Sequence, residues 1–448
     1  MRDFAVSDDP GVQAQLDRLA ALTIPQGRLS LAPTRRILAR LGDPHLSLPP
    51  VFHIAGTNGK GSTSAFLRAM LEAGALRVHQ FTSPHLVRYN ERIRLAGDLI
   101  SNAALAKVLC EVLDASEDIG ASFFEITTVA AFLAFARTPA DACVLEVGLG
   151  GRFDATNVVE RPAICGIASL GLDHERFLLA PEDGVPAHPM ARIAFEKAGI
   201  VKPGVPVVTQ AYGPEAQAET VRSAQGVGAP LHMRGDDWDA RATDTIAYRD
   251  RHGELDLPLP SLPGSFQADN AAMAVAMLRH QDRVTVSPDA MRKGIRAADW
   301  PARLQWLQHG PLTGIVPEAR VLLDGGHNPD AGRVLGEFLE GLDGPIIAIG
   351  GMLAAKDSGG FLAPFASRLE SFIAVPVPGH DAATTVDLAA AAIHAGAKIA
   401  HTAPSVEEAM REIANRDRPG EPFSGTVLIC GSLYLAGEVL RANGQRPE

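Results

Sequence analysis

Residues 51–63 read VFHIAGTNGKGST, and this stretch decides the fold. It begins with an apolar strand, Val51–Ala55, passes through a glycine-rich turn with one lysine, and runs into a helix-forming segment. Backbone N–H groups at the start of such a helix face an anion, and the lysine adds positive charge. The stretch departs from the strict Walker A string, because Ile54 and Gly61 stand where that string has glycine and a hydroxyl residue. The turn still predicts a polyphosphate site made of Gly56, Thr57, Asn58, Gly59, Lys60, Gly61 and Ser62.

A second apolar strand with polar residues at its end lies much further along the chain. Residues 321–331 read VLLDGGHNPDA and place Asp324, His327 and Asn328 after the strand. A chain of 448 residues is longer than one hydrophobic core usually supports, so we expect two domains. A nucleotide loop in one domain and polar strand-end groups in the other indicate an ATP-using enzyme with its site between them. Helix capping and turn formation are the alternative roles for Asp324 and His327.

Short apolar strands alternate with longer helical patterns along the chain, which is typical of parallel sheets covered by helices. The expected fold class is α/β, with an N-terminal P-loop-type ATPase domain over residues 1–298 and a smaller Rossmann-like domain over residues 318–448. Scattered prolines predict a linker over residues 299–317. Residues 235–263 are expected to form a small antiparallel excursion or a surface loop.

The predicted elements of the first domain are strands at 51–55, 142–147, 164–169 and 205–209, and helices at 62–73, 103–114, 127–136 and 270–278. Those of the second are strands at 320–324, 346–350, 372–375, 398–401 and 426–430, and helices at 330–342, 386–395 and 405–415.

Composition limits the classes of partner. The formal charge is -11 and no long basic tract occurs, so nucleic acid is not an expected partner. No run approaches the roughly 20 apolar residues of a membrane span, so no membrane association is expected. The four cysteines form no CxxC pair and three lie in apolar runs, which predicts reduced thiols in a cytoplasmic protein. The composition is compatible with a monomer.

Several further strings occur in the order 82–94 TSPHLVRYNERIR, 145–157 LEVGLGGRFDATN, 172–174 LDH, 196–200 EKAGI and 323–329 LDGGHNP. Together with GTNGKGS they resemble the folylpolyglutamate synthase/dihydrofolate synthase family, which belongs to the Mur-type ATP-dependent amide ligases. The resemblance covers most of the chain. LEVGLGGRFDATN is long and unusual, so chance agreement is improbable.

The resemblance implies ATP-dependent ligation of L-glutamate to dihydropteroate and to the γ-carboxylate of reduced folates, through an acyl phosphate. ATP is then a co-substrate, and two Mg²⁺ ions are implied, for which Mn²⁺ can substitute. The expected partners are these small molecules. Two alternatives stay open: a Mur-type amide ligase acting on another carboxylate substrate, and a non-catalytic nucleotide-binding relative.

The same resemblance implies metal ligands at Ser83, Glu146 and His174. A glutamate inside an apolar strand is costly to bury unpaired, which independently favours a cation partner for Glu146. Lys197 matches a lysine that is carboxylated by CO₂ in the family. The alternative for Lys197 is an ordinary surface helix pair with Glu196. The implied catalytic residues are Lys60, Lys197, His174 and His327.

For the nucleotide, the resemblance implies contacts from Asn270, Arg303 and Asp324. For the pterin, an aromatic face can stack on the ring and a carboxylate can accept its N–H donors. The implied pterin-binding residues are Phe124, Glu125, Phe153, Asp154 and Ala155.

Two departures from the family pattern stand out. The family usually has an Ile-Asp-Leu segment near its N-terminus that helps to hold the pteroate, and residues 27–31 read GRLSL here. The segment between His174 and Lys197 is longer than usual and contains Pro181, Pro186 and Pro189. That loop is expected to lie near the metal.

Overall fold

The computed structural model describes residues 6–22, 30–416 and 422–448, apart from the side chain of Arg176. Three residues of the altered N-terminal segment, Gly27, Arg28 and Leu29, lie outside them. The chain divides into two compact units. Unit 1 comprises Met1–His85, Tyr89–Ser261 and Ser265–Asp299, and unit 2 comprises Leu86–Arg88, Leu262–Gly264 and Trp300–Glu448.

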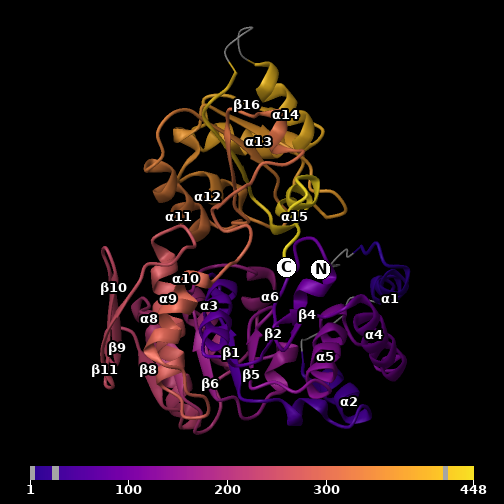
Figure 1. Cartoon of the computed structure of the whole chain (residues 1–448), viewed down its shortest axis with the longest axis vertical. Helices are drawn as coiled ribbons and strands as arrows, with labels where there is room; N and C mark the ends of the chain where they lie inside the picture. Colours follow the sequence, from indigo (N-terminus) through magenta and orange to yellow (C-terminus); the bar gives the residue numbers. More distant parts are fainter. Residues whose placement is uncertain (1–5, 23–29, 417–421) are drawn as a thin grey trace. The chain divides into compact units, whose positions relative to one another are not determined.

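Unit 1 contains an eight-stranded sheet in the order β4-β3-β2-β5-β1-β6-β7-β8 (Figure 1). The six strands from β2 to β8 in this order run parallel, while β3 and β4 are antiparallel at one edge. Every residue of β1 is buried, as expected of a strand inside a parallel sheet that is covered on both faces. The strands are β1 Val51–Ala55, β2 Val78–Phe81, β3 Ile93–Leu95, β4 Asp98–Leu99, β5 Ala142–Glu146, β6 Ile164–Ile167, β7 Val207–Thr209 and β8 Leu231–Met233.

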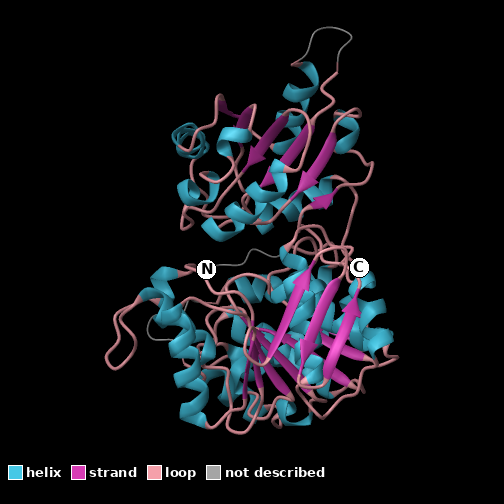
Figure 2. Ribbon diagram, turned by 90° about the vertical axis from the view of Figure 1, so that its left-hand side faces the viewer, coloured by secondary structure: helices cyan, strands magenta, loops and turns pink. Residues whose placement is uncertain are grey.

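Helices cover both faces of this sheet (Figure 2). One group, α3, α9 and α10, packs together, and a second group contains α1, α4 and α5. The helices of unit 1 are α1 Pro10–Ala20, α2 Ala32–Arg40, α3 Lys60–Ala73, α4 Asn102–Ser116, α5 Phe123–Ala136, α6 Glu175–Leu178, α7 Pro189–Ala198, α8 Pro214–Val227, α9 Phe266–Arg279 and α10 Pro288–Ala297. None of the described helices is long and apolar enough to cross a membrane.

The antiparallel excursion expected for residues 235–263 is present. It is a three-stranded sheet of β9 Trp238–Ala242, β10 Ile246–Asp250 and β11 Gly253–Leu257. Its strands β9 and β10 contact α9, beside which they run in Figure 1.

Unit 2 contains a six-stranded sheet in the order β12-β13-β17-β14-β15-β16. All its pairings are parallel except that of β12 with β13. The strands are β12 Gln305–Trp306, β13 Arg320–Leu323, β14 Ile346–Gly350, β15 Ser371–Ala374, β16 Ala400–Thr402 and β17 Thr426–Cys430. The helices are α11 Pro329–Glu340, α12 Ser358–Leu362, α13 Thr385–His394, α14 Val406–Asn415 and α15 Leu433–Ala442.

The α/β class and the smaller second domain are confirmed, with local differences. Residues 300–317, expected within a linker, belong to unit 2, because β12 joins its sheet. Helix α5 begins at Phe123, earlier than expected, because Ser122 and Glu125 form a capping box. Strand β2 had no prediction, since its residues His79 and Gln80 are polar although buried.

Candidate active site

Four loops of unit 1 meet at one edge of the sheet. Strands β2, β5, β1 and β6 are consecutive neighbours and parallel, so their carboxyl ends lie side by side. Ser83 follows β2, Glu146 ends β5, the glycine-rich turn follows β1, and His174 lies in the segment after β6. Open α/β sheets bind ligands at this edge. The topology therefore brings the phosphate turn and the expected metal ligands to one region.

The turn after β1 is held by the loop that follows β6. Thr57 donates its backbone N–H to the Ser169 carbonyl at 2.8 Å, and its hydroxyl to the Gly171 carbonyl at 2.9 Å. Gly56 has φ of +150°, and a Cβ there would lie 2.9 Å from the Cβ of Ala168. The turn thus needs glycine where it passes β6, and its conformation is fixed by main-chain contacts.

The N-terminus of α3 carries no side-chain cap. Its N-cap residue is Gly59 at φ of +84°, and the first turn contains no acidic residue. Lys60 folds back, and its Nζ donates to the carbonyls of Gly56 at 2.9 Å and Thr57 at 3.2 Å. A Cβ on Gly59 would lie 2.5 Å from Oδ1 of Asn270, which α9 supplies. The expected nucleotide residues of unit 1 therefore surround a helix end suited to phosphate.

Ser83 and Glu146 are in direct contact. The Ser83 N–H lies 3.4 Å from Oε2 of Glu146, whose side chain is buried. His174 has a left-handed backbone, and its Nε2 lies 3.8 Å from Oδ2 of Asp173. Within the described chain, no three His, Cys, Asp or Glu side chains form a metal cluster. A buried carboxylate suits Mg²⁺, which keeps most of its ligands as water and substrate phosphate.

Lys197 lies in the last turn of α7 and is buried. Burial lowers the pKa of Lys197 to about 7, and the charge of Lys60 acts in the same direction. Glu196 is buried as well and forms ion pairs with Arg152 at 2.8 Å and Arg192 at 3.2 Å. The alternative of an ordinary surface pair between Glu196 and Lys197 is therefore wrong.

The two carboxylates expected to bind pterin are engaged within the protein. Oδ2 of Asp154 accepts the backbone N–H groups of Gly148 at 3.0 Å and Leu149 at 2.9 Å. Its Oδ1 accepts the N–H of Thr156 at 3.0 Å and the Thr156 hydroxyl at 2.5 Å. A carboxylate has about four acceptor sites, so Asp154 is saturated. Glu125 accepts the Ser122 N–H at 2.8 Å in the capping box of α5.

The other expected pterin residues are neighbours of these two carboxylates in the chain: Phe124 lies in the first turn of α5, and Phe153 and Ala155 flank Asp154. The ring of Phe124 leaves no room for a side chain on Gly148, because a Cβ there would lie 2.4 Å from Cζ of Phe124. Phe153 stacks under the guanidinium of Arg152, with the ring centroid 4.3 Å from Cζ of the arginine. Ala155 is buried at the start of a short 3₁₀ turn.

Unit 2 groups its own expected residues at the end of β13. Oδ1 of Asp324 accepts the N–H of Gly326 at 2.7 Å, and Oδ2 accepts the N–H of Leu304 at 2.9 Å. Burial raises the pKa of the Asp324 carboxyl, and Arg303 opposes this shift. Nδ1 of His327 lies 2.9 Å from the Gly325 carbonyl oxygen. Asn328 caps α11 by accepting the N–H of Ala331 at 2.9 Å.

Sequence reasoning missed the acidic neighbour of His174 and the partners of Glu196. Asp173 stands inside the LDH string, and its neighbour His174 donates its backbone N–H to Oδ1 of Asp173 at 2.7 Å. Arg152 follows the double glycine of the long string and pairs with Glu196. Asp173 and Arg152 both lie within the quoted motifs. Each directly precedes an expected site residue, His174 or Phe153, and this position could have identified them from the sequence.

The comparisons with known proteins agree along most of the chain. Residues 312–442 match the family model described as the C-terminal domain of dihydrofolate synthetase. The dihydrofolate synthase/folylpolyglutamate synthase of Escherichia coli K12 is 35% identical over 431 residues, which cover 95% of this chain and 93% of that protein.

Solved structures show the same similarity. A structure of E. coli FolC in complex with DHPP and ADP has a TM-score of 0.83 and 34% identity, covering 96% of this chain and 97% of that one. The bifunctional enzyme of Yersinia pestis with AMPPNP and Mn has a TM-score of 0.82 and 32% identity, covering 96% and 97%. The chain belongs to the bifunctional folylpolyglutamate synthase/dihydrofolate synthase family.

Proposed function

We propose that this protein joins L-glutamate to dihydropteroate and to the γ-carboxylate of reduced folates, using ATP. The observation that carries the proposal is the uncapped N-terminus of α3 with Lys60, next to the Ser83–Glu146 pair at one sheet edge. An anion site beside a buried carboxylate suits a nucleotide triphosphate with its divalent cation. Membership of the family supplies the substrates.

The reaction needs two steps. The substrate carboxylate attacks the γ-phosphorus of ATP, and the bond to the β-phosphate oxygen breaks, giving an acyl phosphate and ADP. The amine of glutamate then attacks the acyl carbon, inorganic phosphate leaves, and the amine gives up a proton. No protein nucleophile is required, so the chain contributes positioning and charge neutralisation.

We assign the phosphates of ATP to the backbone N–H groups of residues 56–62. Lys60 would exchange its two carbonyl partners for phosphate oxygens, which is a short movement of a flexible side chain. The nucleotide is assigned to contacts from Asn270, Arg303 and Asp324. His327 is assigned to a contact with either the glutamate or the nucleotide.

Ser83, Glu146 and His174 are assigned to Mg²⁺, with Mn²⁺ as a substitute. A bound divalent cation would supply positive charge to the phosphoryl group during transfer. Glu146 is suited to hold it because its buried carboxylate lies at the strand end, where a cation partner compensates for its burial.

We assign the pterin to Phe124 and to the loop that carries Phe153 and Ala155. The saturated carboxylate of Asp154 shapes this loop, so recognition falls to the aromatic ring and to main-chain groups. Glu125 contributes by capping α5, the helix whose first turn contains Phe124.

Lys197 is proposed to react with CO₂. Its pKa of about 7 leaves a large neutral fraction at physiological pH, and only the neutral amine is a nucleophile. The nitrogen forms a bond to the CO₂ carbon, one C=O electron pair moves to oxygen, and a proton goes to solvent. The product is a carbamate, which reverses the charge of the side chain.

Unit 1 is thus proposed as the domain for ATP, metal and pterin, and unit 2 as the ligase domain. We also infer a cytoplasmic location, supported by four cysteines without disulfides, three of them buried.

The test is ADP release with MgATP and L-glutamate, comparing dihydropteroate with tetrahydrofolate. Glutamate-dependent release with both substrates is expected. Release with neither would contradict the proposal and favour a ligase for another carboxylate. Nucleotide binding without any turnover would favour a non-catalytic relative.

A further inference from the structure

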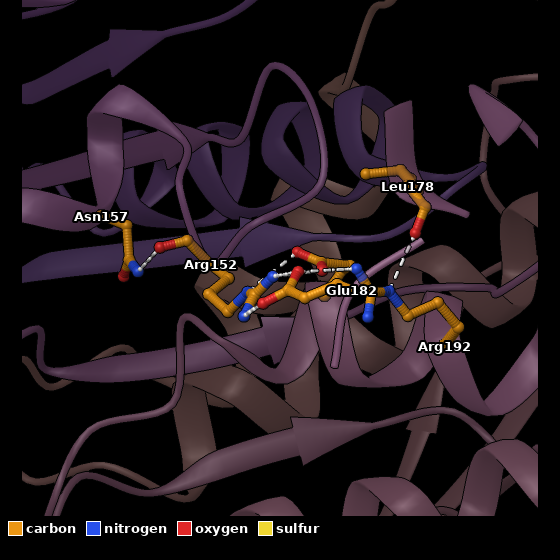
Figure 3. A network of polar contacts seen from close by, with 6 residues as sticks. Arg152, Asn157, Leu178, Glu182 and Arg192 are labelled. Carbon is orange, nitrogen blue, oxygen red and sulfur yellow. Dashed lines mark hydrogen bonds and ion pairs between the residues drawn. The ribbon is translucent and has the colours of Figure 1, made fainter. Parts of the chain in front are cut away.

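Four charged side chains join the loop between α6 and α7 to the turn that carries Lys197. They are Arg152, Glu182, Arg192 and Glu196, and their side chains are only 21%, 15%, 6% and 7% exposed. Figure 3 shows Glu182 between the two guanidinium groups. The loop is the one that is longer than the family pattern leads us to expect.

Glu182 contacts both arginines. Its Oε1 accepts Nη1 of Arg152 at 3.0 Å, and its Oε2 accepts Nη2 of Arg152 at 2.6 Å and Nη2 of Arg192 at 2.9 Å. Glu196 lies between the same two guanidinium groups. Two carboxylates thus alternate with two guanidiniums, and the pairing of Glu182 with Arg152 is bidentate, the strongest form of such contacts.

The two arginines also donate hydrogen bonds to backbone carbonyls of the neighbouring segments. Nε of Arg192 donates to the carbonyl of Leu178 at 3.0 Å, at the end of α6 (Figure 3). The backbone N–H of Arg152 donates to the carbonyl of Glu196 at 2.8 Å. Asn157 donates to the carbonyls of Arg152 and Gly199, both at 3.0 Å. The turn after β5 is therefore bonded to both sides of Lys197.

The two segments also touch without intervening side chains. A Cβ on Gly151 would lie 2.8 Å from the carbonyl oxygen of Glu196 and 2.9 Å from that of Lys197. A Cβ on Gly199 would lie 2.4 Å from the Cβ of Arg152. Because this contact has no slack, a shift of Arg152 displaces the last turn of α7 and the side chain of Lys197 with it.

We propose that Glu182 is a positioning residue that fixes Lys197 through Arg152 and Arg192. Without the Glu182 charge, the two guanidiniums share Glu196 alone and repel each other at short range. The loop then loses the ionic part of its attachment to α7, while the hydrogen bond from Arg192 to Leu178 remains, and the turn that carries Lys197 is held less firmly. This inference rests on the function proposed above for Lys197.

The test compares Glu182→Gln with Asp183→Asn in the full-length protein. Asp183 is the exposed next residue of the same loop, so its variant removes one charge without touching the network. Four quantities are measured: kcat, KM for MgATP, the ¹³C carbamate signal after incubation with ¹³C-bicarbonate, and the thermal midpoint. Lys197→Met identifies the carbamate signal of Lys197.

We expect Glu182→Gln to lower kcat by about tenfold and to leave KM for MgATP unchanged. A tenfold loss is at the lower end of the effects seen when a residue that orients a functional group is replaced. The Lys197 carbamate signal of Glu182→Gln should fall, and more bicarbonate should be needed for half-maximal activity. Asp183→Asn should match the wild type in all four quantities. A Glu182→Asp variant, whose shorter side chain keeps the charge, should restore part of kcat and of the carbamate signal.

The outcomes separate this inference from the proposed function. If the wild type is active, and Glu182→Gln and Asp183→Asn have the same kcat and the same carbamate signal, the role of Glu182 is overturned and the proposed function stands. Wild-type turnover without a Lys197 carbamate would overturn this role too, while the ligase function stands. Absence of glutamate-dependent ADP release from the wild type would overturn the proposed function. If Glu182→Gln does not fold, wild-type values in a folded Glu182→Asp with a lowered thermal midpoint would assign Glu182 to stability only.

Discussion

The loops after β1 and β5 are both glycine-rich turns at the same edge of the unit 1 sheet, yet they treat negative charge differently. The β5 loop encloses an anion of its own, because the N–H groups of Gly148 and Leu149 point at the Asp154 carboxylate. The β1 loop leads into a helix whose first turn contains no acidic residue, and Gly59 replaces a capping side chain there. Similar composition therefore leads to an uncapped helix end in one loop and to an internally bound carboxylate in the other.

The comparison predicts that substitution of Lys60 or Gly59 in the β1 loop changes kinetics, whereas substitution of Asp154 in the β5 loop changes stability. A glycine-rich string by itself does not distinguish the two cases. The distinguishing feature is whether an acidic side chain a few residues further along accepts hydrogen bonds from the backbone N–H groups of the loop.

The largest effect is expected for Lys60→Met. The variant keeps the aliphatic stem and loses the charge that we assign to the transferring phosphoryl group, so kcat should fall by about 10²–10³-fold. The midpoint of urea unfolding should stay near that of the wild type, because the half-buried ammonium donates to carbonyls of its own loop. ADP release measures the rate, with exposed Lys107→Met as the control. A variant with wild-type kcat would remove the β1 loop from the reaction.

Asp154→Asn should destabilise the protein by about 2 kcal/mol, because an amide NH₂ would face backbone N–H donors in a buried loop. Urea unfolding measures this loss, and KM for MgATP should remain unchanged. Asp183→Asn, which removes an exposed charge, is the matched control. Unchanged stability combined with a raised KM for dihydropteroate would instead make the carboxylate a pterin ligand.

Gly59→Ala tests how closely Asn270 approaches the β1 loop. The added Cβ would lie 2.5 Å from Oδ1 of Asn270, so we expect KM for MgATP to rise about tenfold through misplacement of the phosphate site. Gly204 also has a left-handed backbone, with φ of +71°, and a Cβ added there would have nothing within 4 Å. Gly204→Ala should therefore share only the backbone strain of about 1 kcal/mol and keep the wild-type KM. Equal KM values in the two variants would argue against the contact.

The sequence predicted secondary structure well where neighbouring residues form one continuous apolar pattern. The buried parallel strand β14 is an unbroken apolar run, and β1 and β17 each contain a single polar residue, so the bounds of all three were predicted as observed. Strand β2 was not predicted, because two of its four residues, His79 and Gln80, are polar. Both are buried, so the strand shows neither an apolar run nor an alternation of apolar and polar residues. Register and neighbour order in the sheet were not accessible from these patterns.

The candidate site divides in the same way. The turn around Lys60 could be recognised locally, since one short string contains the strand, the glycines and the lysine. The approach of Asn270 to Gly59 joins residues far apart in the chain, and only the family resemblance suggested it. The saturation of Asp154 was not predictable, because it depends on backbone geometry and the sequence showed only a carboxylate beside glycines.

The smallest predicted effect concerns Lys197, whose backbone borders the β5 loop and whose pKa responds to the charge of the β1 loop. With a pKa of about 7, the neutral fraction of Lys197 rises with pH, roughly twofold between pH 7 and pH 8, and then levels off. The initial rate of carbamate formation, followed by ¹³C spectroscopy at fixed CO₂, should follow this fraction. Lys60→Met removes a like charge, so it should move the midpoint of this profile to higher pH. A midpoint that stays in place would mean that the charge of Lys60 does not act on Lys197, whereas a shift would show that the charge of a lysine in the β1 loop lowers the pKa of a lysine that the β5 loop contacts.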